Sequence, residues 1–346
     1  MFAANRLRLM WRVARPVIMI WCVITIVSSQ GLAQGTVKSF HTTVAPKAGE
    51  DIAKPCEYDM KVPSETKTIS ALFVVFERGP ELQHFYEEAE LAAFATKHDL
   101  AMFMPNGCAS KDHEEIDVEP EKGLGRALFT AIDQLSQQAN HPELRTAPLI
   151  LLGFSGAGAL AGRFPTFAPD RIAAVILSHA GQVPPLNLDT INLSGQALKV
   201  PELILVGAQD KIVGTEVAYA HFSRYWQLGA PWLFATQNDA NHFCNEDATD
   251  LILAWLDTVL HNRLLKQSPA TIAKTEGYNA FFRKEINGSL DSGNRPLAEA
   301  VDLLFQPPTE APPENRIPAG WLPSEHVALM WEKFTTLPDH HASTKP

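Results

Sequence analysis

One serine stands where its hydroxyl could act as a nucleophile. Ser155 lies in the segment LILLGFSGAGALAG, two residues after an apolar run that ends at Gly153. Attack on an acyl group needs a serine hydroxyl that projects from a sharp turn between a strand and a helix, with little bulk around it. Small residues permit that turn, and the helix N-terminus favours developing negative charge. The pattern predicts a nucleophilic Ser155; a turn that serves packing alone is the alternative.

A carboxylate and a histidine follow this serine along the chain. A serine hydroxyl reacts poorly until a base takes its proton, and a histidine base needs a carboxylate to orient it. Asp210 follows an apolar run in VPELILVGAQD, and His242 follows another in WLFATQNDANH. Asp239 and Glu246 are alternative carboxylates, close to His242 but not at a strand end, and each candidate could instead be an ordinary loop residue. Together, the positions of Asp210 and His242 after successive apolar runs would place them at the same sheet edge as Ser155, which predicts a catalytic triad.

The elements that would position these residues alternate regularly from residue 70 onward. Apolar runs of strand length are separated by amphipathic stretches of helix length, which indicates an α/β class with a parallel sheet covered on both faces. Two edge strands are expected before it, at residues 36–44 and 57–62. The main strands are predicted at Ile69–Phe76, Ala101–Met104, Pro148–Gly153, Ala173–Ser178, Leu203–Gly207 and Trp232–Thr236, and the helices at Glu81–His98, Gly125–Gln138, Ala159–Phe164, Thr215–Leu228 and Asp247–Leu264.

The N-terminal segment has the features of a signal peptide. Four arginines and no acidic residue accompany an apolar run at Val17–Val27, followed by small residues before Ala33. This pattern predicts a signal peptide over residues 1–33, cleaved after Ala33. An uncleaved membrane anchor is the alternative, but the run is shorter than the roughly 20 residues that a spanning helix needs. The mature protein is therefore expected to be secreted or periplasmic, without a stable membrane anchor.

The composition changes again near the C-terminus. We assign residues 34–265 to a catalytic domain and residues 266–346 to an irregular extension packed on or near it. The extension contains the stretch PPTEAPPEN, which resists regular structure, and two apolar islands. A short helix capped by Ser324 is expected in the second island.

Charge and cysteine content limit the possible partners. The chain has 29 basic and 39 acidic residues, and no stripe of Lys and Arg, so nucleic acid is not an expected partner. No cysteines or histidines have the spacing of a metal site, and we expect no metal or cofactor. Three cysteines follow the predicted signal peptide, which permits one disulfide in an oxidising compartment.

Four segments together resemble blocks of the α/β-hydrolase superfamily, in particular its secreted esterase and polyhydroxyalkanoate-depolymerase-like branch. The resemblance implies an eight-stranded, mostly parallel sheet with helices on both faces. It also implies that Ser155, Asp210 and His242 are nucleophile, acid and base. Ala157 replaces the last glycine of the G-x-S-x-G pattern, a departure of one methyl group. The four segments are Leu72–Gly79, Gly153–Gly158, Gly207–Gly214 and Asn241–Phe243.

The oxyanion hole is where this chain departs further from the family pattern. One expected donor is the backbone N–H of Gly156, directly after the nucleophile. The second normally comes from the turn after the first main strand, where relatives carry a His-Gly pair and this chain reads FERGP. Pro80 has no N–H, so Arg78 or Gly79 must serve. We assign Arg78; a surface turn without a catalytic part is the alternative.

The resemblance also bears on the cysteines and the cleft. The superfamily's second strand is antiparallel and neighbours its fourth, which would bring Cys56 near Cys108; we predict this disulfide and a free Cys244. His179 should face the same crevice as the triad, either as a substrate-binding residue or as a packed loop histidine. Only residues 181–200 separate this strand from the next, too few for a large lid. The expected open cleft suits a bulky or polymeric ester.

The sequence thus predicts an esterase that acts through an acyl-serine intermediate. Two alternatives stay open at this stage. One is a peptidase or acyltransferase on the same triad, because the pocket chooses the leaving group and the acceptor. The other is a non-catalytic binding protein on a hydrolase scaffold. The atypical turn at residues 77–80 supports this alternative.

Overall fold

The computed structural model describes most of the chain after the predicted signal peptide. Residues 1–33, to which that prediction applies, lie outside the described ranges. No helix within those ranges is long and apolar enough to cross a membrane. The described residues are 37–76, 80–111, 119–181, 187–238, 240–243, 248–264, 277–283, 303–314 and 316–336.

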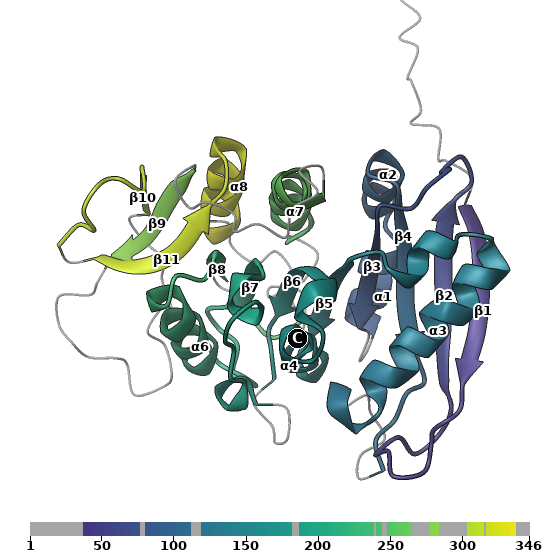
Figure 1. Cartoon of the computed structure of the whole chain (residues 1–346). Coiled ribbons are helices and arrows are strands. Elements are labelled where there is room, and N and C mark those ends of the chain that lie inside the picture. Colours follow the sequence, from purple (N-terminus) through teal and green to yellow (C-terminus); the bar gives the residue numbers. More distant parts are fainter. Residues whose placement is uncertain are drawn as a thin grey trace, which may run out of the picture. The chain divides into compact units, whose positions relative to one another are not determined.

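Eleven strands form one sheet in the order β1-β2-β4-β3-β5-β6-β7-β8-β11-β9-β10 (Figure 1). The strands from β3 to β8 are parallel to one another, and β2 is antiparallel to both β1 and β4. An antiparallel second strand, with β4 and β3 exchanged in the order, gives the α/β-hydrolase fold that the sequence predicts. The strands are β1 Val37–Val44, β2 Cys56–Pro63, β3 Ala71–Phe76, β4 Leu100–Asn106, β5 Leu149–Phe154, β6 Ile172–Ser178, β7 Glu202–Gly207, β8 Trp232–Gln237, β9 Tyr278–Arg283, β10 Leu304–Gln306 and β11 Arg316–Leu322.

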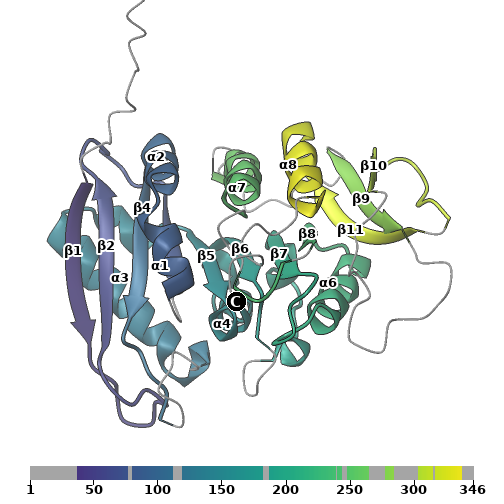
Figure 2. The ribbon, with the colours of Figure 1, turned by 180° about the vertical axis from the view of Figure 1, so that it is seen from behind.

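Helices cover both faces of this sheet, whose central strands are mostly apolar and wholly buried. Every residue of β3, β5, β6, β7 and β8 is buried, so neither face can be left to water. Right-handed crossovers place a connection on the opposite face when the strand order reverses. The order reverses at β4, so α3, α4 and α6 lie on the face opposite α1 and α2 (Figures 1 and 2). The α-helices are α1 Pro80–Glu87, α2 Ala89–Lys97, α3 Leu124–Ala139, α4 Gly156–Ala161, α5 Phe164–Phe167, α6 Glu216–Gln227, α7 Thr249–Leu264 and α8 Glu325–Thr336.

The described part of the C-terminal extension contains three strands and a helix. Beyond the expected eight strands, β11, β9 and β10 continue the sheet as antiparallel strands. Gly320 pairs with Leu233 of β8, and a Cβ at Gly320 would lie 2.3 Å from the Trp232 carbonyl oxygen, so only glycine fits there. The predicted helix after Ser324 is α8, and the Ser324 hydroxyl accepts a hydrogen bond from the Val327 amide at 3.3 Å.

Two side chains, the buried Trp331 and the partly buried Tyr219, fasten this extension to the rest of the sheet. The Trp331 indole of α8 donates a hydrogen bond to the Phe234 carbonyl of β8 at 3.0 Å. The Tyr219 hydroxyl of α6 donates to the Pro318 carbonyl of β11 at 2.9 Å. The described strands of the extension therefore cover what would otherwise be an open edge at β8.

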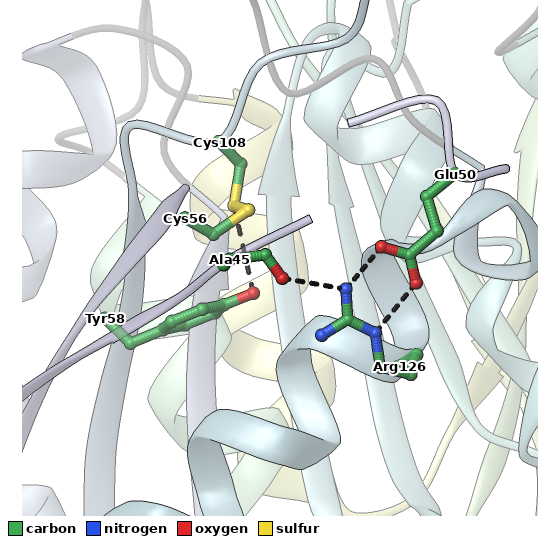
Figure 3. The surroundings of a disulfide bond; sticks show 6 residues. All are labelled: Ala45, Glu50, Cys56, Tyr58, Cys108 and Arg126. Carbon is green, nitrogen blue, oxygen red and sulfur yellow. Dashed lines mark hydrogen bonds and ion pairs between the residues drawn. A yellow bond between two sulfur atoms is a disulfide. The ribbon is translucent and has the colours of Figure 1, made fainter. Parts of the chain in front are cut away.

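A disulfide between Cys56 and Cys108 joins the start of β2 to the segment after β4 (Figure 3). Backbone hydrogen bonds run beside it, from the Ala53 amide to the Ala109 carbonyl and from the Lys111 amide to the Asp51 carbonyl, both at 2.8 Å. The Tyr58 hydroxyl lies 3.8 Å from the Cys108 sulfur. The covalent link and the backbone ladder thus hold the same two segments together.

An ion pair fixes α3 beside this disulfide. The Arg126 guanidinium donates to both carboxylate oxygens of Glu50, with an Nε–Oε1 distance of 2.8 Å, and to the Ala45 carbonyl at 3.2 Å (Figure 3). The hydrogen bond from Arg126 lowers the pKa of Glu50 from its ordinary value despite partial burial. The loop between β1 and β2 is therefore anchored to a helix as well as to β4.

We predict that replacing both Cys56 and Cys108 with alanine lowers the free energy of unfolding by about 4 kcal/mol. The two cysteines are 52 residues apart in the sequence, and opening a loop of this length returns conformational entropy to the unfolded chain. Urea unfolding followed by tryptophan fluorescence measures the change. A reductant should bring the wild-type midpoint down to that of the double variant and leave the variant unchanged. A wild-type midpoint that does not respond to reductant would contradict the prediction.

Candidate active site

Ser155 occupies a strained turn between β5 and α4. Its φ is 53° and its ψ is −126°, a left-handed backbone conformation that costs a non-glycine residue about 1–3 kcal/mol. Hydrogen bonds hold the backbone in place: the Ser155 amide donates to the Ser178 carbonyl at 3.0 Å, and the Ser155 carbonyl accepts from Gly158 at 2.9 Å and from Gly181 at 2.6 Å. The surrounding backbone therefore imposes the conformation that projects the Ser155 side chain from the strand end.

Glycines surround this turn because the backbone segments approach closely. A Cβ at Gly153 would lie 2.1 Å from the Ala157 carbonyl oxygen, and one at Gly181 would lie 2.9 Å from the backbone of Gly156. Ala157 itself is fully buried, so the chain accommodates its methyl group where the G-x-S-x-G pattern has glycine. The close contacts explain why the segment around Ser155 is built from small residues.

Three side chains from different loops meet at the carboxyl ends of the central strands. The Ser155 Oγ lies 3.1 Å from His242 Nε2, and His242 Nδ1 lies 2.7 Å from Asp210 Oδ2. Asp210 follows β7 and His242 follows β8, and both are almost fully buried. The two loops are also joined through their backbones, since the Gln209 amide donates to the Ala240 carbonyl at 2.8 Å. The structure thus brings together the three residues of the predicted triad.

The second carboxylate oxygen of Asp210 is held by backbone amides. Oδ1 accepts hydrogen bonds from Ile212 at 2.8 Å and from Val213 at 3.0 Å. Burial alone would raise the pKa of Asp210, but the hydrogen bond from His242, the neighbouring His179 and the Val213 amide together lower that pKa below its ordinary value of 3.8. An ionised carboxylate only accepts hydrogen bonds, so Nδ1 of His242 carries a proton. Nε2 is then left to accept the proton of Ser155.

Aromatic rings enclose His242 on several sides. The ring centroid of Phe154 lies 5.0 Å from that of His242, and Phe243 and His179 pack against His242 edge to face at 5.2 and 5.8 Å. These contacts restrict rotation of the imidazole and keep it aligned between its two hydrogen-bond partners. The sequence alone does not indicate that Phe154 and Phe243 pack against His242; their adjacency to Ser155 and His242 in the chain is the signal for it.

His179 is buried rather than open to the cleft. It is 1% exposed, its φ is 47°, and its Nδ1 lies 3.1 Å from the Ser178 hydroxyl. Its amide donates to the Leu205 carbonyl at 2.9 Å. Of the two interpretations open from the sequence, this burial favours a packed histidine that supports His242 over a residue that contacts substrate.

Of the remaining predicted site residues, Gly156 is described and several others are not. Gly156 is the first residue of α4, where a backbone N–H has no carbonyl one turn earlier to bond, so this N–H is suitably placed for an oxyanion. Among the described residues, no group of three or more His, Cys, Asp or Glu side chains could hold a metal ion. Of the residues that the sequence singles out, Glu77, Arg78, Gly79, Asp239, Cys244 and Glu246 lie outside the described ranges.

No protein-family model and no curated protein matches the sequence. Among solved structures, the chain is similar to a ferulic acid esterase, with 15% identity and a TM-score of 0.43 over 60% of this chain and 91% of that one. It is similar to MGS-M1, an α/β hydrolase enzyme from a Medee basin deep-sea metagenome library, with 16% identity and a TM-score of 0.45 over 66% and 99%. It is also similar to the Pyrococcus horikoshii acylaminoacyl peptidase, with 11% identity and a TM-score of 0.48 over 64% and 42%. Such distant likenesses transfer no role to any residue.

We predict that Asp210→Asn destabilises the protein at neutral pH, and that this loss shrinks as the pH falls below 3.8. The folded-state pKa of Asp210 is lowered, so its stabilising contribution is complete above the unfolded-state pKa and is lost as the pH falls through the folded-state value. Urea unfolding midpoints of wild type and variant across this pH range measure the difference. Asp170→Asn, at an exposed position, controls for the removal of one negative charge. A gap that stays constant with pH would contradict the prediction.

Proposed function

We propose that this chain is a secreted or periplasmic serine hydrolase that cleaves carboxylic esters through an acyl-Ser155 intermediate. The observation that carries this proposal is the hydrogen-bonded series from Ser155 to His242 to Asp210, with distances of 3.1 and 2.7 Å. A nucleophile, a base and an orienting carboxylate in this arrangement are what acyl transfer by serine requires.

In the proposed reaction, His242 Nε2 takes the Ser155 proton as Oγ attacks the carbonyl carbon of the ester. The carbonyl oxygen becomes an oxyanion, stabilised by the Gly156 N–H and by a second donor that we assign to Arg78. As the intermediate collapses, the imidazolium gives its proton to the leaving alcohol oxygen. Water then loses a proton to His242 and attacks the acyl-enzyme, and Ser155 regains its proton when the acid leaves. Asp210 stabilises the imidazolium during both acylation and deacylation.

An ester substrate with a bulky or polymeric part is the proposed substrate class. Ester cleavage is chemically easier than amide cleavage, because an alkoxide is a better leaving group than an amide anion. The described part of the connection between β6 and β7 contains two single-turn 3-10 helices, Leu188–Thr190 and Ala197–Lys199. A connection of this size supports an accessible site, which favours a large substrate.

Replacement of Ser155 with alanine is expected to lower kcat/KM for a p-nitrophenyl ester by at least about 10³-fold, because no other group can form the acyl-enzyme. A fluorophosphonate probe should label the wild type and leave Ser155→Ala unlabelled. Aminoacyl anilides, tested beside the esters, separate an esterase from a peptidase. If the wild-type protein neither takes up the probe nor hydrolyses any ester, the proposed function is wrong and a binding protein is favoured.

The proposed export is tested by the N-terminus of the mature protein. In a bacterial host, protein recovered outside the cytoplasm should begin at Gln34, because the signal peptidase would cleave after Ala33. Ala33→Arg removes the small side chain that the peptidase requires and should leave an uncleaved precursor. Disulfide formation between Cys56 and Cys108 supports the same localisation. Recovery of full-length wild-type protein in the cytoplasm would contradict export.

A further inference from the structure

An exposed aromatic ring stands directly beside His242. Phe243 is 53% exposed, and its ring packs edge to face against His242 at 5.2 Å and lies 6.5 Å from the ring of Phe154. The Phe243 amide donates a hydrogen bond to Asn241 Oδ1 at 2.9 Å, which fixes the loop that carries the ring. A large apolar side chain is therefore held toward solvent at the edge of the candidate site.

A second exposed apolar side chain lies on the loop of the carboxylate. Ile212 is 64% exposed, and its amide is one of the two that bind Asp210 Oδ1, at 2.8 Å. Asp210 in turn binds His242, and Phe243 follows His242 in the chain. Ile212 and Phe243 therefore lie beside the two partners of the same hydrogen bond. The two residues, 31 positions apart in the sequence, thus each adjoin one member of the Asp210–His242 pair.

Single exposed apolar residues are common on protein surfaces, whereas exposed apolar residues that gather around one site mark a place where a ligand binds. The other large apolar side chains that are exposed among the described residues are Val37, Leu228 and Leu329, and none of them belongs to the loops after β5, β7 or β8. Ile212 and Phe243 both belong to loops that supply residues of the triad. A shared ligand accounts for their exposure at this place better than chance does.

The direction of proton transfer decides which part of a substrate these residues would meet. His242 Nε2 must deliver its proton to the leaving oxygen, so the leaving group has to lie within hydrogen-bond distance of that nitrogen. The oxyanion lies instead at the N-terminus of α4, beside Gly156. The group next to His242, and hence next to Phe243, is the alcohol portion of the ester.

We infer that Phe243 and Ile212 form an apolar subsite for the alcohol portion of the substrate, so that the enzyme favours esters of long-chain or aromatic alcohols. This inference rests on the proposed esterase function and specifies its substrate class. Apolar contact with two half-exposed side chains should raise kcat/KM about fivefold when the alcohol is lengthened by two methylenes.

The test measures kcat/KM for ethyl, butyl, hexyl and 2-phenylethyl acetates, which share one acyl group and leaving groups of similar basicity. The ratio of hexyl to ethyl acetate should fall about tenfold in Phe243→Ala and severalfold in Ile212→Ser, while Phe243→Leu retains most of it. Leu228→Ser is the matched control, since Leu228 is 61% exposed but lies at the end of α6, and it should keep the wild-type ratio.

A parallel series of ethyl esters with lengthening acyl groups completes the test. If the variants lose selectivity in the acyl series instead, or keep the hexyl-to-ethyl ratio, the subsite is wrong while the esterase function stands. If the wild type hydrolyses none of the esters and takes up no fluorophosphonate, the esterase function fails and the subsite fails with it. Loss of the alcohol preference in the Phe243 and Ile212 variants alone supports the subsite.

Discussion

The hydrogen bond between Asp210 and His242 is the interaction on which the candidate site depends. A buried carboxylate is costly unless its oxygens are satisfied, and here the imidazole takes one oxygen while two backbone amides take the other. That arrangement keeps Asp210 ionised, which places a proton on Nδ1 and turns Nε2 toward Ser155. The reactivity proposed for Ser155 therefore originates in how the Asp210 carboxylate is held.

The parallel sheet makes this arrangement possible because it gathers strand ends. Ser155, Asp210 and His242 each follow a different strand, and parallel neighbours bring their carboxyl ends to one edge. The strain at Ser155 is tolerated because hydrogen bonds from both sides hold its backbone. The rings around His242 then leave the imidazole little freedom to turn. The sheet, the strained turn at Ser155 and the ring packing around His242 thus all hold the same three side chains in place.

The central strands are secured on their two sides by different means. At the first, the Cys56–Cys108 disulfide and the Arg126–Glu50 ion pair fasten β2, the loop before it and α3. At the other, β11 pairs with β8, and Trp331 and Tyr219 bind that extension through backbone carbonyls. The central strands that carry the site are therefore flanked by strands on both sides. The strand ends from which the site loops begin are thus held in place.

The sequence by itself determined the α/β class, the main strands and the positions of Ser155, Asp210 and His242 after strands, because apolar periodicity and small-residue turns are local properties of the chain. The tertiary structure decided what depends on distant partners. The pairing of Gly320 with Leu233, which adds β11 to the sheet, joins segments 87 positions apart and has no local signal. The amides on Asp210 and the exposure of Phe243 likewise follow from how the loops meet, since burial and contact are set only when strands have assembled.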